Sequence, residues 1–185
     1  MRVRFSFRSG LPFWQAMLLL LLVCGGACGQ NSGPDAGQGR HAAQCVTALD
    51  GDSLLMEEHG EKYQVRLLGV DCPEKGQEFA DKARTASRAF ARGKIVELEY
   101  GPRRTDRYGR VLAYVWREGQ MLNELLVRKG LALAIAHDQG EPHANLLKQA
   151  MDMARRDKTG FWSKGGLDRT PAQFRKERKR AGRTP

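Results

Sequence analysis

The sequence contains no apolar run long enough to be a comfortable membrane span. Its most hydrophobic stretch extends only from Phe13 to Cys24, whereas a spanning helix needs about 20 residues. The sequence also has no internal repeat, which excludes repeat architectures. When a leader of about 40 residues is set aside, the chain still suffices for one domain that buries its core without disulfides.

Net charge is scarce where we expect the folded domain. The formal net charge of +10 by itself suggests a polyanionic partner. However, residues 1–40 account for +3 and residues 165–185 for +5, so residues 41–164 carry only +2. A nucleic-acid function must therefore be argued from a local site and from the tail, not from the overall charge.

Residues 1–29 have the order of a secretory signal. Three arginines in the first eight residues precede the apolar run, and small residues follow it. Cleavage after Ala27-Cys28-Gly29, acylation of Cys28 in a lipoprotein box, and retention as an uncleaved anchor all fit this pattern. We expect export, with the chain secreted, periplasmic or membrane-anchored, and with membrane contact only through the leader or a lipid. Residues 30–41 then form a flexible linker rich in small and polar residues.

The next part of the chain alternates short strands with helices. Helical periodicity and glycine stops predict three helices, over 81–92, 121–129 and 143–157. Short apolar or alternating segments predict strands over 45–48, 53–56, 63–70, 95–100, 111–116 and 131–136. This order predicts an α+β, mainly β fold: a five-stranded OB-type barrel with about three helices. Such barrels commonly bind single-stranded nucleic acid.

The stretch from Arg66 to Glu74 combines a buried strand with charged ends. Its apolar run begins at a cation and ends at Asp71 and Glu74, which flank Pro73. Proline donates no hydrogen bond to a sheet ladder and favours an extended residue before it, so the strand is expected to stop here. A buried strand bracketed by opposite charges is uncommon as packing and indicates a functional site.

Two other segments complete this charged set. Asp50-Gly51-Asp52-Ser53 and the segment from Thr105 to Arg110 are, taken singly, ordinary turns with charged residues. Together with the central stretch they supply several carboxylates and arginines, which suits a divalent metal beside a phosphate. Asp52 and Asp71 would repel each other if brought together, and a hard cation such as Ca²⁺ would relieve that repulsion.

These segments resemble the staphylococcal nuclease (thermonuclease) family over residues 42–164. The matching motifs are Asp50-Gly51-Asp52-Ser53, Arg66 to Glu74, Thr105 to Arg110, Met121 to Glu124, Leu126 to Ala132 and Gly160 to Ser163. The resemblance implies a five-stranded OB barrel with three helices. It also implies calcium-dependent hydrolysis of DNA and RNA phosphodiesters.

The resemblance implies one Ca²⁺ ion and names its ligands. By position, Asp52 and Asp71 are the carboxylate ligands, and Cys72 contributes its backbone carbonyl. Cys72 stands where the family usually has threonine, and a carbonyl ligand survives that exchange. A disulfide between Cys72 and Cys45 is not expected, because Cys45 lies about five strand residues, roughly 16 Å, before the aspartate turn.

The resemblance also implies the residues that act on the substrate. Glu74 activates or orients the attacking water, while Arg66 and Arg110 hold the phosphate; Arg107 and Tyr108 contact a neighbouring phosphate. These roles agree with the needs of phosphate hydrolysis, namely a placed nucleophile, charge stabilisation and a polarising metal. One departure concerns contact with a nucleobase. Where the family has aromatic residues that stack on a base, this sequence has the segment from Ala134 to Asp138. The loss of each stacking contact should weaken nucleotide binding by about 1–3 kcal/mol.

We therefore expect a monomeric, metal-dependent endonuclease that acts on DNA and RNA with little sequence preference. The 3′-phosphate products follow from the resemblance alone. The alternative is a non-catalytic nucleic-acid-binding OB module of the cell envelope. The sequence further predicts that residues 165–185 form a basic, disordered tail that adds affinity for long nucleic acids.

Overall fold

The structure is a computed structural model that describes residues 39–135 and 141–182. The expected leader, most of the linker, and the positions of His137 and Asp138 lie outside the described residues. In the part of the chain that the structure describes, no helix has both the length and the apolar composition needed to cross a membrane.

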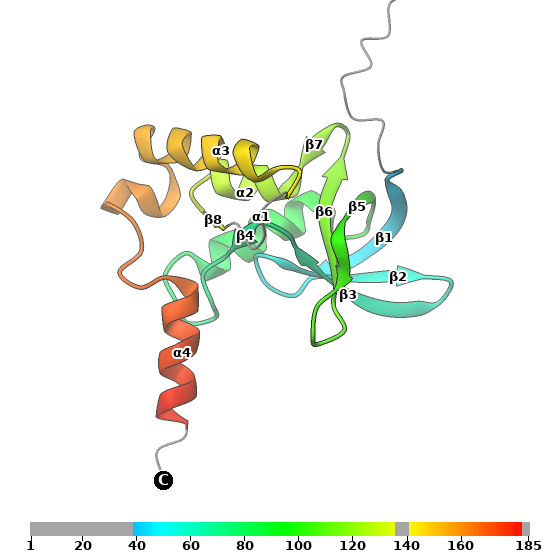
Figure 1. Cartoon of the computed structure of the whole chain (residues 1–185), viewed down its shortest axis with the longest axis horizontal. Helices are drawn as coiled ribbons and strands as arrows, with labels where there is room; N and C mark the ends of the chain where they lie inside the picture. The colour runs from blue at the N-terminus through cyan, green and yellow to red at the C-terminus, as the bar shows by residue number, and fades with distance from the viewer. Residues whose placement is uncertain (1–38, 136–140, 183–185) are drawn as a thin grey trace, which may run out of the picture. The chain divides into compact units, whose positions relative to one another are not determined.

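Five strands form a closed barrel, and Figure 1 shows these strands beside a group of helices. The strand order is β3-β2-β1-β5-β6, and a parallel pairing of β3 with β6 closes the barrel while the other neighbours are antiparallel. The predicted OB-type barrel is confirmed. The barrel strands are β1 (His41–Ala48), β2 (Ser53–Glu58), β3 (Glu61–Leu67), β5 (Lys94–Thr105) and β6 (Val111–Arg117).

Short strands and helices complete the domain. Strand β4 pairs with β8 in a separate two-stranded sheet, and β7 extends β6 through a tight turn. The remaining elements are β4 (Val70–Asp71), α1 (Ala80–Ala91), β7 (Gln120–Met121), α2 (Leu122–Arg128), β8 (Leu133–Ala134), α3 (Ala144–Arg156), the 3-10 helix η1 (Gly160–Lys164) and α4 (Pro171–Ala181). The three predicted helices correspond to α1, α2 and α3.

Two predicted strands differ from the structure. The strand predicted over 63–70 is interrupted at Gly69, whose φ of 70° turns the chain and separates β3 from β4. Glycine adopts this left-handed conformation without the steric penalty of a side chain. Of the strand predicted over 131–136, the described residues 131–135 contain the two-residue β8, which pairs with the equally short β4.

The tail also differs from expectation. Residues 171–181 form helix α4 rather than a disordered extension. Its start carries a full capping box: Gln173 donates its backbone N–H to the Thr170 side chain, and the Gln173 side chain accepts from the Thr170 N–H. Pro171 occupies the first turn, where its missing N–H is not needed. These local signals explain why the basic run is helical.

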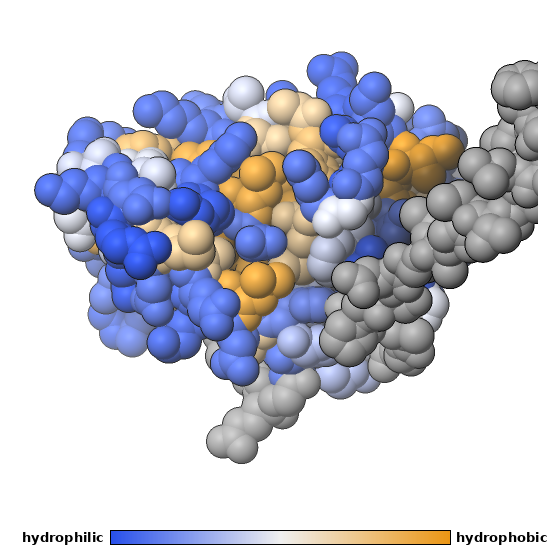
Figure 2. All heavy atoms as spheres, turned by 90° about the horizontal axis from the view of Figure 1, so that it is seen from above, coloured by the Kyte–Doolittle hydropathy of each residue, from blue (hydrophilic) through white to orange (hydrophobic). Residues whose placement is uncertain are grey.

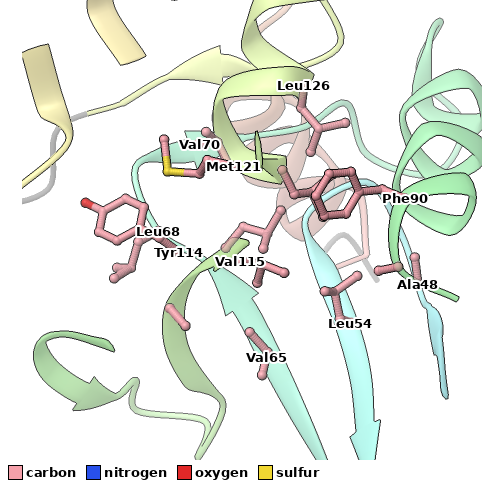
Figure 3. Close-up of a cluster of buried hydrophobic side chains, with 14 of the residues drawn as sticks. Ala48, Leu54, Val65, Leu68, Val70, Phe90, Tyr114, Val115, Met121 and Leu126 are labelled. Carbon is pink, nitrogen blue, oxygen red and sulfur yellow. The ribbon is translucent and has the colours of Figure 1, made fainter. Parts of the chain in front are cut away.

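The core lies between the barrel wall and helices α1 and α2. In Figure 3, Phe90 from α1 and Leu126 from α2 lie among strand side chains that include Leu54, Val65 and Val115. Helix α1 presents its buried residues at helical spacing, and β5 alternates buried and exposed positions as the sequence pattern predicts. One continuous apolar cluster therefore fixes the strand ends that carry the charged residues.

The face of the molecule drawn in Figure 2 is mainly hydrophilic where it is coloured. Figure 2 shows polar side chains over most of the viewed face, with apolar surface confined to smaller areas between them. This distribution is expected of a domain whose large apolar residues fill a single core.

Candidate active site

The turn between β1 and β2 points Asp52 into the protein. The Asp50 side chain accepts a hydrogen bond from the Asp52 N–H at 3.0 Å, which shapes the turn. Gly51 packs so closely that a Cβ there would lie 2.7 Å from the Cys72 side chain. The Ser87 hydroxyl on α1 donates to the Gly51 carbonyl at 2.6 Å. Helix α1 thus holds this turn against the end of β4.

Two buried aspartates meet at this point. The Cys72 N–H donates to Asp52 Oδ2 at 2.7 Å, which links the first turn to the residue after β4. Arg66 bridges both acids: its Nη1 lies 2.6 Å from Asp52 Oδ2, and its Nη2 lies 3.3 Å from Asp71 Oδ1. Arg66 Nη2 also donates to the Val70 carbonyl at 3.0 Å. The two predicted carboxylate ligands of the metal are therefore both in contact with Arg66, a predicted phosphate ligand.

The electrostatics of this cluster favour additional positive charge. Burial raises the pKa of Asp52 from 3.8 to about 7. The guanidinium of Arg66 lowers this pKa, while the nearby charges of Asp50 and Asp71 raise it again. Two neighbouring buried aspartates also repel each other when both are ionised, and a nearby cation would reduce that repulsion. The cluster is thus an attractive place for a cation.

The cysteine beside the acids is an apolar neighbour. Burial raises the pKa of the Cys72 thiol well above its ordinary value, and the adjacent Asp52 adds to this effect. The thiol is therefore neutral, which leaves the backbone carbonyl as the ligand that Cys72 can offer to a hard cation. Cys72 and Cys45 are both buried and free, so no disulfide joins them.

Glu74 contacts a residue that sequence reasoning did not place in the site. Arg175 of α4 donates to Glu74 Oε1 at 2.6 Å. The same guanidinium contacts both oxygens of Asp71, at 2.9 and 3.0 Å. Helix α4 therefore reaches the acidic cluster across 104 residues of sequence.

The hairpin between β5 and β6 supplies the other cationic side of the site. Asp106 Oδ1 accepts from the backbone N–H groups of Tyr108 and Arg110, at 2.8 and 3.0 Å. Its Oδ2 accepts from the Arg110 Nε at 2.8 Å, which fixes that guanidinium. Arg107 donates to the hydroxyl of Tyr108, whose ring is 65% exposed. These hydrogen bonds thus fix the turn, which presents two arginines and an exposed aromatic ring.

A cleft of about 680 Å³ brings these parts together. Six predicted site residues line the cleft, namely Asp52, Arg66, Glu74, Arg107, Tyr108 and Arg110. Asp71 and Cys72 are buried and are not among the lining residues. Sequence reasoning missed other charged residues of the lining, namely Asp50, Arg103, Asp106, Glu141, Arg175 and Lys179. Beyond Tyr108 a second hollow of about 650 Å³ continues toward Lys62 and Tyr63.

Comparison with known proteins identifies the family. The model of the family described as "Staphylococcal nuclease homologue" matches residues 64–164. The chain belongs to the staphylococcal nuclease family. Two thermonucleases, from Staphylococcus hyicus and Staphylococcus intermedius, are each 32% identical to it, over 124 and 122 residues. These matches cover 64% and 63% of this chain and 73% of each thermonuclease.

A further relative supports the same membership. The endonuclease YncB of Bacillus subtilis is 33% identical over 128 residues, which is 64% of this chain and 60% of that protein. The resemblance found in the motifs is therefore confirmed, and membership places the chain among the nuclease-type hydrolases.

The acidic cluster fits the cation that the staphylococcal nuclease family implies. Within residues 39–135 and 141–182, no three or more His, Cys, Asp or Glu side chains form a ready metal cage. Ca²⁺ does not need such a cage, because it accepts backbone carbonyls and water alongside a few carboxylates. Asp52 and Asp71 already attract two guanidiniums, so their surroundings suit a bound positive charge.

The cleft residues that sequence reasoning missed differ in how strongly the sequence indicates them. Asp50 and Asp106 stand inside the motifs, and their turn-forming roles could have been inferred from the preference of Asp for such positions. Glu141 and Arg175 carry no comparable signal. Each comes from a segment that is distant in sequence, and a charged residue there looks like ordinary solvated surface.

Proposed function

We propose that this protein is a Ca²⁺-dependent endonuclease that hydrolyses phosphodiester bonds of DNA and RNA with little sequence preference. It works as a monomer and leaves 3′-phosphates. The observation that carries the proposal is that the cleft gathers Arg66 and Glu74 from the two ends of one stretch and Arg110 from a distant hairpin, next to buried aspartates. Membership of a nuclease family and relatives named thermonuclease and endonuclease support it.

The arginines of the cleft bind the scissile phosphate in this proposal. A guanidinium is always charged, and its planar fork matches phosphate oxygens. Arg66 is fixed by Asp52 and Arg110 by Asp106, so neither has to reorganise greatly to meet the phosphate. Prearranged positive charge of this kind stabilises the negative charge that grows on the equatorial oxygens during hydrolysis.

Glu74 is the general base of the proposed reaction. It lines the cleft, and its carboxylate removes a proton from the water that attacks phosphorus. A Ca²⁺ ion held by Asp52, Asp71 and the carbonyl of Cys72 supplies Lewis-acid charge beside the phosphate. In the proposed chemistry the ion would therefore supply positive charge, while Glu74 carries out the proton transfer.

Arg107 and Tyr108 explain the proposed lack of sequence preference. Both are exposed on the hairpin at the cleft, where they can contact a neighbouring phosphate. Phosphate contacts position a nucleic acid but carry no direct sequence information. A cleft whose arginines contact phosphates is thus suited to many sequences and to either sugar.

The substitution Glu74→Gln tests the assignment of the base. We expect turnover on plasmid DNA and on RNA to fall by about 10²- to 10⁴-fold, the usual contribution of a general base. Glu78→Gln is the matched control, because Glu78 is exposed and pairs only with Lys164 among the described residues. Near-native turnover in a folded Glu74→Gln protein would remove Glu74 from the mechanism.

Chelation tests the metal. Excess EGTA should abolish cleavage, and added Ca²⁺ should restore it, since the Lewis-acid charge that polarises the phosphate is lost without the ion. Full activity in chelator contradicts the metal assignment. If the protein binds DNA but cleaves neither DNA nor RNA under any of these conditions, it is a nucleic-acid-binding module instead.

We also propose that the protein is exported through its N-terminal leader, either released or membrane-anchored. Mass spectrometry of the mature chain distinguishes the outcomes: a free N-terminus after Gly29, a lipid on Cys28, or an intact leader. An intact leader on protein found in the cytoplasm contradicts export.

A further inference from the structure

Helix α4 places one guanidinium on the acids that the proposed metal needs. Arg175 contacts both oxygens of Asp71 and one oxygen of Glu74, all within 3.0 Å. Asp71 is only 3% exposed, so its side chain has little room for several cations at once. The same two acids are the proposed metal ligand and the proposed base.

This contact opposes catalysis in two ways. A guanidinium chelated by Asp71 supplies positive charge where a metal ion would supply it. An oxygen of Glu74 that accepts a hydrogen bond from Arg175 is also not free to accept one from the attacking water. Arginine stays charged at any pH at which the protein folds, so this competitor cannot be removed by deprotonation.

Helix α4 is attached in a way that allows release. Its side chains are mostly exposed, and Pro171 alone is buried. Besides the Arg175 contacts, the Gln77 side chain donates to the Arg169 carbonyl at 2.9 Å just before the helix. The ring of Phe174 also lies close to Gly76. Figure 1 shows α4 apart from the other helices, near the C-terminal end of the chain, and Lys179, one turn beyond Arg175, lines the same cleft. A helix held mainly by ion pairs can leave when its partners find another cation.

We propose that α4 is an internal competitor for the metal, so that docked Arg175 and a cation bound at Asp71 exclude each other. The inference rests on the proposed function and adds regulation to that same site. Loading of Ca²⁺ then displaces Arg175, frees Glu74 and releases α4 with its basic residues. The site is held closed when calcium is scarce and opens as calcium rises.

The expected change in Ca²⁺ affinity follows from the fraction of molecules in which α4 is docked. An apparent dissociation constant equals the intrinsic constant divided by the fraction of molecules that can bind. If α4 is docked in about 90–99% of molecules, Ca²⁺ binds roughly 10- to 100-fold more weakly than it would without Arg175.

Calorimetric titration of the full chain with CaCl₂ tests this directly. We expect Arg175→Ala to bind Ca²⁺ roughly 10- to 100-fold more tightly than the parent, and Arg175→Lys to fall between them because lysine lacks the planar fork. Arg178→Ala is the control: it removes the same charge from an exposed position of the same helix and should bind as the parent does. Equal or weaker binding by Arg175→Ala overturns the proposal.

Hydrogen exchange gives a second readout that does not depend on activity. In the parent, saturating Ca²⁺ should speed exchange of the α4 amides by about tenfold or more, while α1 stays protected. In Arg175→Ala these amides should exchange fast with or without calcium. Unchanged α4 protection in calcium-loaded parent protein overturns the inference.

The outcomes separate this inference from the proposed function. Tighter Ca²⁺ binding by Arg175→Ala without any nuclease activity supports the competitor and contradicts the endonuclease. Calcium-dependent cleavage, together with identical Ca²⁺ affinities in the parent and Arg175→Ala, supports the endonuclease and contradicts the competitor. If Ca²⁺ binds neither protein, both proposals are wrong.

Discussion

Replacement of Asn123 should destabilise the protein strongly, because this side chain connects three elements inside the core. Asn123 is fully buried at the start of α2. Its Oδ1 accepts from the Val115 N–H in β6 at 3.0 Å, and its Nδ2 donates to the Leu68 carbonyl at 2.8 Å. Leu68 begins the turn that leads into β4 and Asp71. One amide therefore ties the barrel, a helix and the acidic strand end together.

The magnitude follows from the two backbone groups that lose their partner in Asn123→Ala. A buried donor or acceptor left without a hydrogen bond costs about 1–3 kcal/mol, so the two together cost roughly 2–6 kcal/mol. For a chain of this size each kcal/mol lowers the melting temperature by about 2–4 °C. We therefore expect a decrease of at least about 4 °C.

Urea unfolding followed by tryptophan fluorescence measures this change. The midpoint should fall while the slope of the transition stays as in the parent, which indicates a pure loss of stability. Asn145→Ala is the matched control, because Asn145 is exposed on α3 and should change stability by less than about 0.5 kcal/mol. If Asn123→Ala unfolds at the parent's midpoint, the two hydrogen bonds contribute nothing and the reasoning fails.

Three further predictions concern the site and its support. Gly51→Ala should destabilise by about 1–3 kcal/mol in thermal melts, since the new Cβ would lie 2.7 Å from the Cys72 side chain; a parent-like melting temperature contradicts that packing. Burial raises the pKa of Cys45 to about 11, so Cys45 and Cys72 should react with a thiol reagent at pH 8 only after unfolding, and fast native labelling is the opposing result. Asp106→Asn should raise KM with little change in stability, because Arg110 loses its ionic partner; an unchanged KM shows that Arg110 needs no such support.

Much of the site was predictable because its residues stand in local motifs. The Asp50–Ser53 turn, the strand end at Asp71 and the hairpin at Arg110 each have a recognisable composition, and the barrel brings them to one cleft as expected. The alternation of β5 and the spacing of α1 also correspond to their burial. In each case the motif that indicates the element lies within a few residues of sequence, although the contacts between the motifs span 14 to 36 residues.

The features that were missed depend on distant contacts. The break at Gly69 had a weak local signal, since a glycine inside a strand pattern often marks a bend. Arg175 had none: a run of basic residues after the last core segment reads as solvated, and nothing near it in sequence indicates Glu74 as a partner. Its position follows from where the capped helix begins and from the contact of Phe174 beside Gly76. Tertiary docking of this kind cannot be inferred from charge spacing.

The parallel closure of the barrel has a consequence for the order in which the nuclease forms. Val65 pairs with Val111, roughly 45 positions further along the chain. Arg66 is one of the three β3 residues that take part in this parallel pairing with β6. Loop-closure entropy delays such non-local pairings relative to the β1–β2 and β2–β3 hairpins. Arg66 and the Arg110 hairpin are therefore brought together only when the barrel closes. An unfolded or half-folded chain has no such cleft, so nuclease activity begins only when the barrel is complete.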